Sequence, residues 1–202
     1  MELAGRHVTL EALRAEHAAG LVAAAAESRD TYSWAPVPKG IAEAEALIAS
    51  RLKLQEAGTW MTFATRSLSD GRIVGSTSFL NIERWEWPQA SGDPDSVEIG
   101  ATWLASSAQR SAVNTEAKLL MLTQAFDAWG VQRVQIKTDA RNARSRAAIE
   151  RLGASFEGVL RSYQPAQGDV GFGGVRDTAM YSIVRAEWPR VRLSLTDRLE
   201  RP

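Results

Sequence analysis

The chain contains no cysteine, and its two histidines stand isolated in the sequence. Without thiols there can be no disulfide, no thiolate metal ligand and no cysteine acyl-enzyme. Two isolated histidines do not form a metal site either, so no metal cofactor is expected. The absence of cysteine also suits a reducing compartment.

Neither sign of charge is in excess, because Lys and Arg number 24 and Asp and Glu also number 24 among 202 residues. With no net charge to attract them, neither nucleic acid nor an anionic membrane is an expected partner. No stretch approaches the roughly 20 apolar residues that span a bilayer, and the short acidic N-terminus does not resemble a signal peptide. We expect a soluble, cytoplasmic protein with one domain over residues 1–202, whose core draws on an apolar content of 45%.

One stretch, Glu98 to Leu122, changes from strand periodicity to helix periodicity. Ile99, Ala101 and Trp103 alternate with Glu98, Gly100 and Thr102, as in a half-buried strand. After a polar turn at Ser106 to Asn114, apolar residues recur at helical spacing, at Leu119, Leu122, Phe126 and Trp129. Asn114 or Thr115 is expected to cap this helix, and Glu116 to lie in its first turn. A strand, a turn and a helix N-terminus form an anion site, since unpaired N–H groups point outward there, and we expect a phosphate.

The residues that follow make this interpretation specific. A second strand at Val131 to Thr138 leads to the sequence NARS from Asn142, which opens a helix ending at Gly153. The segments EIG from Glu98, QRSAVNTEA from Gln109, NARS from Asn142 and IERLGA from Ile149 resemble the acetyl-CoA-binding core of the GNAT N-acetyltransferase superfamily. Within the superfamily the sequence is most similar to the RimJ/RimL-like branch. The resemblance covers about residues 95–160 strongly and the remainder by the order of elements.

Two features depart from the family pattern. The superfamily turn reads Gln/Arg-x-x-Gly-x-Gly/Ala, and here Gln109 fits while Ala112 and Asn114 stand at the later positions. Glycine permits positive φ and close approach to a pyrophosphate, an alanine adds a methyl group, and Asn tolerates the left-handed conformation. At Ile149 many members carry a tyrosine proton donor. The RimJ/RimL-like branch tends to have a serine one turn earlier, where this chain has Ser145.

The whole chain predicts an α/β (α+β) fold. Strands are expected at 7–13, 60–66, 73–82, 98–103, 131–138, 155–164 and 176–184, and helices at 15–28, 41–58, 114–129, 142–152 and within 186–202. A glycine-rich segment, 168–174, joins the last two strands and is expected to be a loop tip rather than a phosphate loop. The resemblance implies a GNAT-like mixed, largely antiparallel, twisted sheet flanked by helices, with a splayed central strand pair. Relative to the family spacing, one extra residue between Gly100 and Gln109 suggests a β-bulge.

The resemblance also implies acetyl-CoA as co-substrate and direct acetyl transfer to a primary amine of a small molecule or peptide. The residues implied in acetyl-CoA binding are Trp103, Leu104, Gln109, Arg110, Ser111, Ala112, Val113, Asn114, Thr115, Asn142 and Ser145. Glu98 is the candidate general base, and its alternative role is that of an ordinary surface strand residue. Ser145 is the candidate proton donor to the departing thiolate, and backbone N–H groups near Trp103 and Leu104 would hold the oxyanion. Asn142 either only caps its helix or also contacts the pantetheine arm.

Acceptor contacts are less defined by the sequence. Tyr32 and Trp34, between the first two helices, are either packing aromatics or part of an acceptor pocket, and Trp85 and Asp177 are further candidates. Acidic residues gather in the loop 83–95 and basic residues in 133–151, an arrangement that suits a cationic amine and an anionic donor.

Two other interpretations stay open. The missing glycines and tyrosine favour a catalytically weak or inactive CoA-binding regulatory module of the same fold. A structural or partner-binding domain could instead use Trp85-Glu-Trp87 as an anchor. The sequence names no particular amine, and it leaves a homodimer open.

Overall fold

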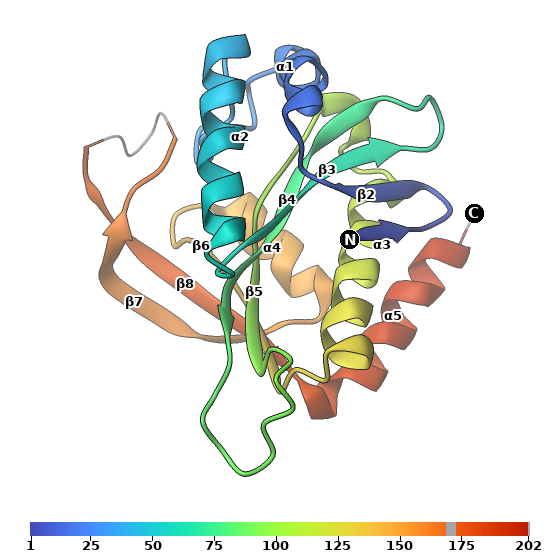
Figure 1. The fold of residues 1–202 in the computed structure, drawn as a ribbon, viewed down its shortest axis with the longest axis vertical. Coiled ribbons are helices and arrows are strands. Elements are labelled where there is room, and N and C mark those ends of the chain that lie inside the picture. The colour runs from blue at the N-terminus through green and yellow to red at the C-terminus, as the bar shows by residue number, and fades with distance from the viewer. Residues whose placement is uncertain (169–172, 202) are drawn as a thin grey trace.

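The computed structural model describes residues 1–168 and 173–201. In these residues one eight-stranded sheet has the order β1-β2-β3-β4-β5-β6-β8-β7 (Figure 1). Neighbouring strands are antiparallel except for β5 and β6, which are parallel. The strands are β1 (Glu2–Ala4), β2 (Val8–Ala12), β3 (Met61–Ser67), β4 (Ile73–Glu83), β5 (Ser96–Leu104), β6 (Arg133–Asp139), β7 (Ser155–Pro165) and β8 (Val175–Val184). The predicted mixed, largely antiparallel sheet is confirmed, and β1 is an addition that the sequence pattern did not indicate.

Helices cover both faces of the sheet (Figure 1). The helices are α1 (Ala18–Ala26), α2 (Ile41–Glu56), α3 (Ala112–Thr123), α4 (Ala143–Leu152) and α5 (Trp188–Glu200). Short 3₁₀ turns at Ala15–His17, Ser106–Ala108 and Arg185–Glu187 and a π turn at Gln124–Ala128 extend or connect them. In the view of Figure 1, α2 lies in front of the sheet and α4 behind it. The predicted glycine-rich tip at 168–174 falls in part on residues 169–172, which lie outside the described residues.

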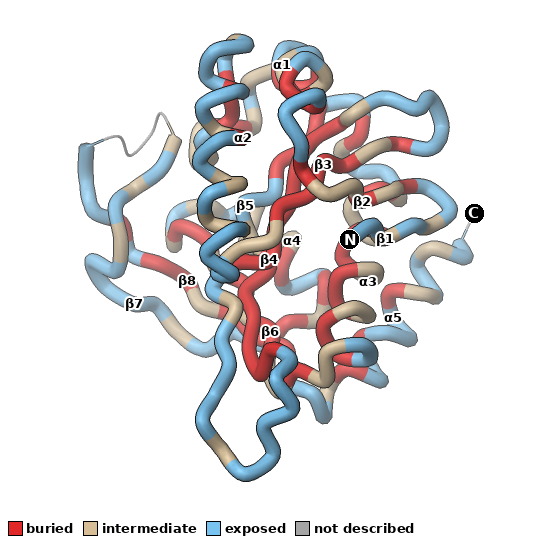
Figure 2. Tube along the Cα trace, in the orientation of Figure 1, coloured by how far each residue is buried: buried red, intermediate tan, exposed pale blue. Residues whose placement is uncertain are grey.

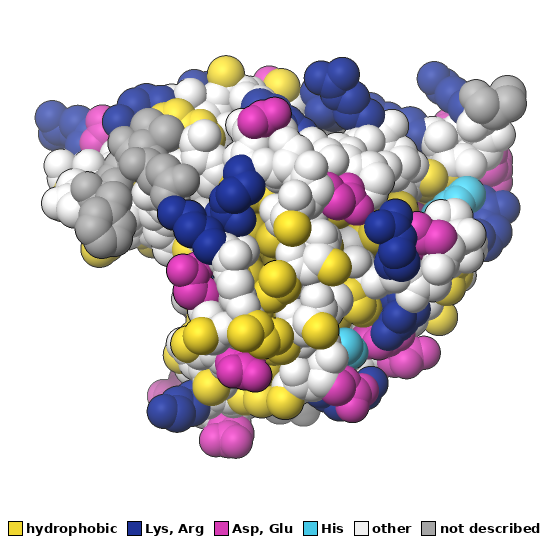
Figure 3. Space-filling model, turned by 90° about the horizontal axis from the view of Figure 1, so that it is seen from above, with side chains coloured by type: hydrophobic (Ala, Val, Ile, Leu, Met, Phe, Trp, Pro, Cys, Tyr) yellow, Lys and Arg dark blue, Asp and Glu magenta, His cyan; other side chains and the backbone are white. Residues whose placement is uncertain are grey.

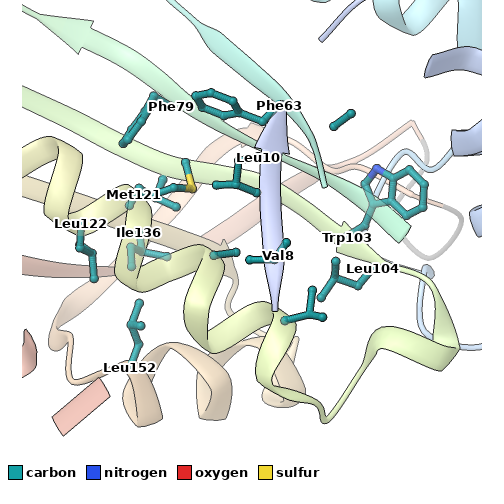
Figure 4. Packing of buried hydrophobic residues seen from close by; sticks show 14 of the residues in the cluster. Val8, Leu10, Phe63, Phe79, Trp103, Leu104, Met121, Leu122, Ile136 and Leu152 are labelled. Carbon is teal, nitrogen blue, oxygen red and sulfur yellow. The ribbon is translucent and has the colours of Figure 1, made fainter. Parts of the chain in front are cut away.

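The core lies between the sheet and α3 with its neighbouring helices. Met121 and Leu122 of α3 lie close to Leu10 and Ile136 of the sheet and to Leu152 of α4 (Figure 4). The central strands are buried along most of their length, whereas the loop between β4 and β5 is mainly exposed (Figure 2). Since both faces of the sheet are covered there, the side chains of Val97, Glu98 and Ile99 are all buried.

Strands β5 and β6 separate after a short paired segment. Their register runs only from Ser96 with Arg133 to Glu98 with Gln135. Beyond that pair, β5 turns away at a bulge, where Ala101 and Thr102 occupy the interval opposite the single residue Thr77. Ala101 has φ 48°. The splay and the bulge implied by the family spacing are therefore both present, and they leave one edge of β5 unpaired.

The bulge also corrects the predicted alternation along β5. Ala101 and Thr102 are both exposed, so Ala101 does not share the buried face of Ile99 as expected. The physical reason is the extra residue, since one inserted position reverses the side to which every later side chain points.

The start of α3 differs from the prediction. Ser111 caps the helix, with its hydroxyl accepting a 3.3 Å hydrogen bond from the Val113 N–H, so Asn114 and Thr115 lie within the first turn. Glu116 does not complement the helix dipole as expected. Its buried carboxylate accepts hydrogen bonds from the backbone N–H groups of Arg6, His7 and Val8 and thereby fixes the β1–β2 turn against α3.

Candidate active site

The connection from the end of β5 to α3 runs from Ala105 to Ser111, so the predicted turn Gln109–Thr115 comprises its last three residues and the first turn of the helix. Arg110 has φ 59° and is the left-handed residue of this turn. Ala112 and Asn114 belong to the α-helix itself, so the left-handed tolerance expected of Asn114 is not used. The missing glycines are therefore compatible with the backbone of the turn, and the opening N–H groups of α3 point out of the helix end.

The Gln109 side chain links three parts of the chain. Its amide nitrogen donates to the Thr31 hydroxyl at 2.9 Å and to the Leu104 carbonyl at 2.8 Å. Its amide oxygen accepts a hydrogen bond from Arg144 of α4 at 2.6 Å. Gln109 thus holds the α1–α2 loop, the end of β5 and the start of α4 together around the turn.

Tyr32, in the α1–α2 loop, packs against Trp103 at the end of β5. The Tyr32 hydroxyl donates to the Leu104 carbonyl at 2.9 Å, and the two rings meet edge to face at 5.7 Å. Both residues are buried, and burial followed by the nearby Glu27 carboxylate raises the pKa of the Tyr32 hydroxyl. These contacts are those of a packing aromatic, the first of the two roles considered for Tyr32.

Trp34 reaches from the same loop to the segment that follows β6. Its partly buried ring lies 4.9 Å from the Arg141 guanidinium, a cation–π contact. Since the α1–α2 loop is tied to the end of β5 through Tyr32 and Gln109, the Trp34–Arg141 contact spans the gap between the splayed strands.

Glu98 stands at the point where β5 and β6 separate. The residue is 3% exposed, which excludes the alternative of an ordinary surface residue. One carboxylate oxygen lies 2.8 Å from the Lys137 ammonium and accepts a 2.8 Å hydrogen bond from the Asn81 amide. The carboxylate is therefore held at the base of the splay by a neighbouring strand on each side.

Asn142 and Ser145 open α4 on the far side of the splay. The Asn142 side chain caps the helix by accepting the Ser145 N–H at 3.0 Å, and Gly153 ends the helix with φ 97°. The Ser145 hydroxyl itself has no hydrogen-bond partner among the described residues, so it is available to a ligand.

Asp177 and Trp85 lie apart from this group. Asp177 of β8 accepts a 2.8 Å hydrogen bond from the Ser162 N–H and borders a surface hollow of about 830 Å³ with Tyr163. Trp85 belongs to the β4–β5 loop, which lies at the opposite end of the sheet from the α1–α2 loop (Figure 1). There Asp95 accepts hydrogen bonds from the Trp85 N–H and the Trp87 indole, so the loop is fixed by its own residues.

The predicted basic segment is mostly paired within the protein. Arg133 pairs with Glu157, Lys137 with Glu98 and Arg141 with Asp139, while Arg144 contacts Gln109 before α3. Seen from above, from the end of the molecule where Figure 1 draws α1, Lys and Arg side chains are interspersed with Asp and Glu (Figure 3). Among the described residues, no group of His, Cys, Asp or Glu could hold a metal ion, and no helix is long and apolar enough to cross a membrane.

Lys118 was not among the sequence candidates. Its buried ammonium donates to the Thr77 and Thr102 hydroxyls at 2.9 and 2.7 Å, directly at the β5 bulge. Burial lowers the pKa of Lys118 to about 7. Its position four residues before Leu122, on the apolar stripe of α3, is the signal that could have identified it.

Arg176 of β8 was also missed. It is buried at 7% exposure, between the exposed neighbours Val175 and Asp177. An arginine at an inward position of a strand is a recognisable signal once the strand's face is known, but the sequence alone did not fix that face.

Comparisons with known proteins agree with this geometry. The model of the acetyltransferase (GNAT) domain matches residues 7–155. A candidate ribosomal N-acetyltransferase of Bacillus subtilis (strain 168), YdaF, is 30% identical over 121 residues, which are 60% of this chain and 58% of that protein. The match therefore spans little more than half the length of that relative.

Solved structures are similar over nearly the whole chain. A GCN5-related N-acetyltransferase from Brucella melitensis superposes with a TM-score of 0.84 and 27% identity, covering 98% of this chain and 85% of that one. RimJ from Mycobacterium smegmatis, solved in complex with CoA-disulfide, has a TM-score of 0.75 and 22% identity, with coverages of 95% and 88%. The splayed strand pair, the serine-capped N-terminus of α3 and the family match lead to one conclusion: the chain belongs to the GNAT family of N-acetyltransferases, in its RimJ/RimL-like branch.

Proposed function

We propose that the protein transfers the acetyl group of acetyl-CoA directly to a primary amine of a small molecule or peptide. The observation that supports this most is the splay of β5 from β6, which ends at the capped N-terminus of α3. The free edge of β5 suits the extended pantetheine arm, which can add to it like a further strand. The RimJ relative was solved with CoA-disulfide, and we propose that this chain also binds a CoA compound.

The donor would be bound in two places. Backbone N–H groups between Gln109 and Thr115 would bind the pyrophosphate, supported by the dipole of α3. The residues fit this role because Ala112 and Asn114 are accommodated in the helix and Arg144 brings a cation to the turn. N–H groups near Trp103 and Leu104 would donate hydrogen bonds to the thioester oxygen as negative charge develops on it.

The acceptor would approach from the α1–α2 side, past Trp34, with Asp177 at the outer margin. An alkylammonium has no free electron pair, so one proton must leave before attack, and Glu98 would take it directly or through water. The nitrogen then forms a bond to the acetyl carbon, and collapse of the tetrahedral intermediate breaks the carbon–sulfur bond. Ser145 would protonate the departing thiolate, since its hydroxyl has no partner among the described residues. The nitrogen loses its second proton as the amide forms, and this proton would restore the Ser145 hydroxyl through water.

An amine-library screen tests this proposal. Acetyl-CoA and the protein are incubated with protein N-terminal peptides, free amino acids, polyamines and aminoglycosides, and the free thiol is measured. We expect amine-dependent thiol release together with the N-acetylated product by mass spectrometry. Tight acetyl-CoA binding without transfer to any amine would instead favour the CoA-binding regulatory module.

A further inference from the structure

Arg176 is a buried guanidinium with most of its donors unused. It is 7% exposed, and its one hydrogen bond among the described residues runs from Nε to the Thr178 hydroxyl at 3.3 Å. No fully enclosed side-chain nitrogen or oxygen of the described residues lacks a partner, so the two Nη groups must open onto accessible space. A guanidinium has five N–H donors, and a carboxylate that enters this space could accept from two of them at once.

The nearby carboxylates are already engaged by other cations. Asp139 is bound by the Arg141 guanidinium through two hydrogen bonds of 2.9 and 2.8 Å. Glu98 is bound by Lys137 at 2.8 Å. The pKa of Arg176 is lowered by burial, and Asp139 and Glu98 act in the opposite direction, so all three belong to one electrostatic cluster.

The sheet register places this cluster on one face. Asp139 pairs with Thr178 and Lys137 with Met180, and Arg176 precedes Thr178 by two residues, so these side chains share a side of the sheet. Asp177 points to the other side by the same alternation, and its carboxylate accepts the Ser162 N–H. Among the described residues, Arg176 is thus a cation of this face that has no carboxylate within ion-pair distance.

We propose that Arg176 binds a carboxylate of the acceptor, so that the acceptor is an amino acid or short peptide with both a free amine and a free carboxylate. This inference rests on the proposed amine transfer. A planar carboxylate matches the two parallel Nη donors, and a largely desolvated guanidinium discriminates strongly against a neutral group in the same place.

The test uses acceptors that differ in one group. Free dipeptides and the matching dipeptide amides are compared by kcat/KM for thiol release from acetyl-CoA. We expect the free dipeptides to be favoured by about tenfold or more. Arg176→Met should abolish the preference through KM rather than kcat, Arg176→Lys should retain part of it, and acetyl-CoA affinity should not change.

A control variant and a binding measurement separate the outcomes. Arg161→Met removes an exposed arginine of the same hairpin and should leave the preference intact. Calorimetry of the CoA complex with N-acetyl dipeptides and their amides reports the carboxylate contact without turnover.

Carboxylate-dependent binding without transfer would refute the amine transfer and keep the Arg176 contact. Phosphoethanolamine, assayed as a further acceptor, carries a phosphate in place of the carboxylate. Transfer with no carboxylate preference, or with a preference for phosphoethanolamine over the dipeptides, would overturn the Arg176 proposal and leave the amine transfer standing. A protein that shows neither would contradict both.

Discussion

Glu98 is the residue on which the proposed chemistry depends most. If it removes the ammonium proton, Glu98→Gln should keep the fold and acetyl-CoA affinity, lower kcat by about 10²–10⁴-fold and remove the acid limb of the pH–rate profile. Glu157→Gln is a matched control, because Glu157 is also ion-paired on the same sheet, to Arg133. If the Glu98 variant keeps the rate and acid limb of the parent protein, then Asp177 or water, and not Glu98, removes the proton.

Ser145 is expected to act on the leaving group rather than in binding. Ser145→Ala should lower the single-turnover rate of acetyl transfer and change acetyl-CoA affinity little, because the side-chain hydroxyl is not used by the α4 cap. Ser155→Ala, which removes a surface hydroxyl bound to Glu187, serves as the control. Single-turnover rates equal to those of the parent protein would show that Ser145 has no role in acetyl transfer beyond its place in α4.

At the scale of single residues, the sequence motif selects candidate residues but does not give their contacts. Glu98, Ser145 and Gln109 could be selected from the motif, but the Lys137 and Asn81 partners of Glu98 come from two other strands. Lys118 and Arg176 were missed because their burial depends on which face of α3 or β8 meets the sheet or its covering loops. The apolar stripe of α3 is a local signal for Lys118, whereas the face of β8 on which Arg176 lies has no such signal.

Among the elements, the N-terminus of α3 is predicted to bind the pyrophosphate. Ala112→Asp would place a carboxylate against the phosphates and should weaken acetyl-CoA binding by about tenfold or more, measured by calorimetry. Ala112→Asn is the neutral control of nearly equal size and should bind more tightly than the Asp variant. An acidic residue in the first turn stabilises a helix, so lost affinity would not reflect unfolding. Unchanged affinity would place the donor elsewhere.

Element types were predictable because periodicity and caps are local. The helix from Asn142 to Gly153 was predicted with both ends, since Asn at the N-cap and Gly beyond the C-terminus are strong signals. The start of α3 was misplaced by three residues or so because Ser111, Asn114 and Thr115 are all good caps. The 3₁₀ turn at Ser106–Ala108 decides between them by presenting the Ala108 carbonyl to the Ser111 hydroxyl at 2.7 Å.

For the whole molecule, Lys118 predicts a pH dependence of stability. Burial lowers the pKa of Lys118 to about 7 from an ordinary value of 10.5. Between these values the unfolded chain binds the additional proton, so the free energy of unfolding should rise with pH, by up to about 1.4 kcal/mol per pH unit. Below about pH 7 both states are protonated and this contribution is constant. Lys118→Met should flatten the rise in urea unfolding, whereas the exposed Lys53→Met should not. Equal slopes in all three proteins would contradict the assignment.

The arrangement of the sheet was predictable only through the family resemblance. Composition and periodicity give strands and helices, but they do not give strand order, and β1 is too short to be distinguished from a turn. The splay depends on β5 leaving β6 after Glu98, which is a property of two strands separated by all of α3.

Amide hydrogen exchange with and without acetyl-CoA tests the central claim most directly, because it locates the donor without assuming an acceptor. If the donor lies in the splay, exchange should slow at Gly100–Thr102 and in the turn 109–115, while the outer edge of β7 is unchanged. The cavity of about 360 Å³ beside the start of α3 is also lined by Arg6, Ser67–Asp70 and Arg72. Protection of those residues with no change along β5 would contradict the account.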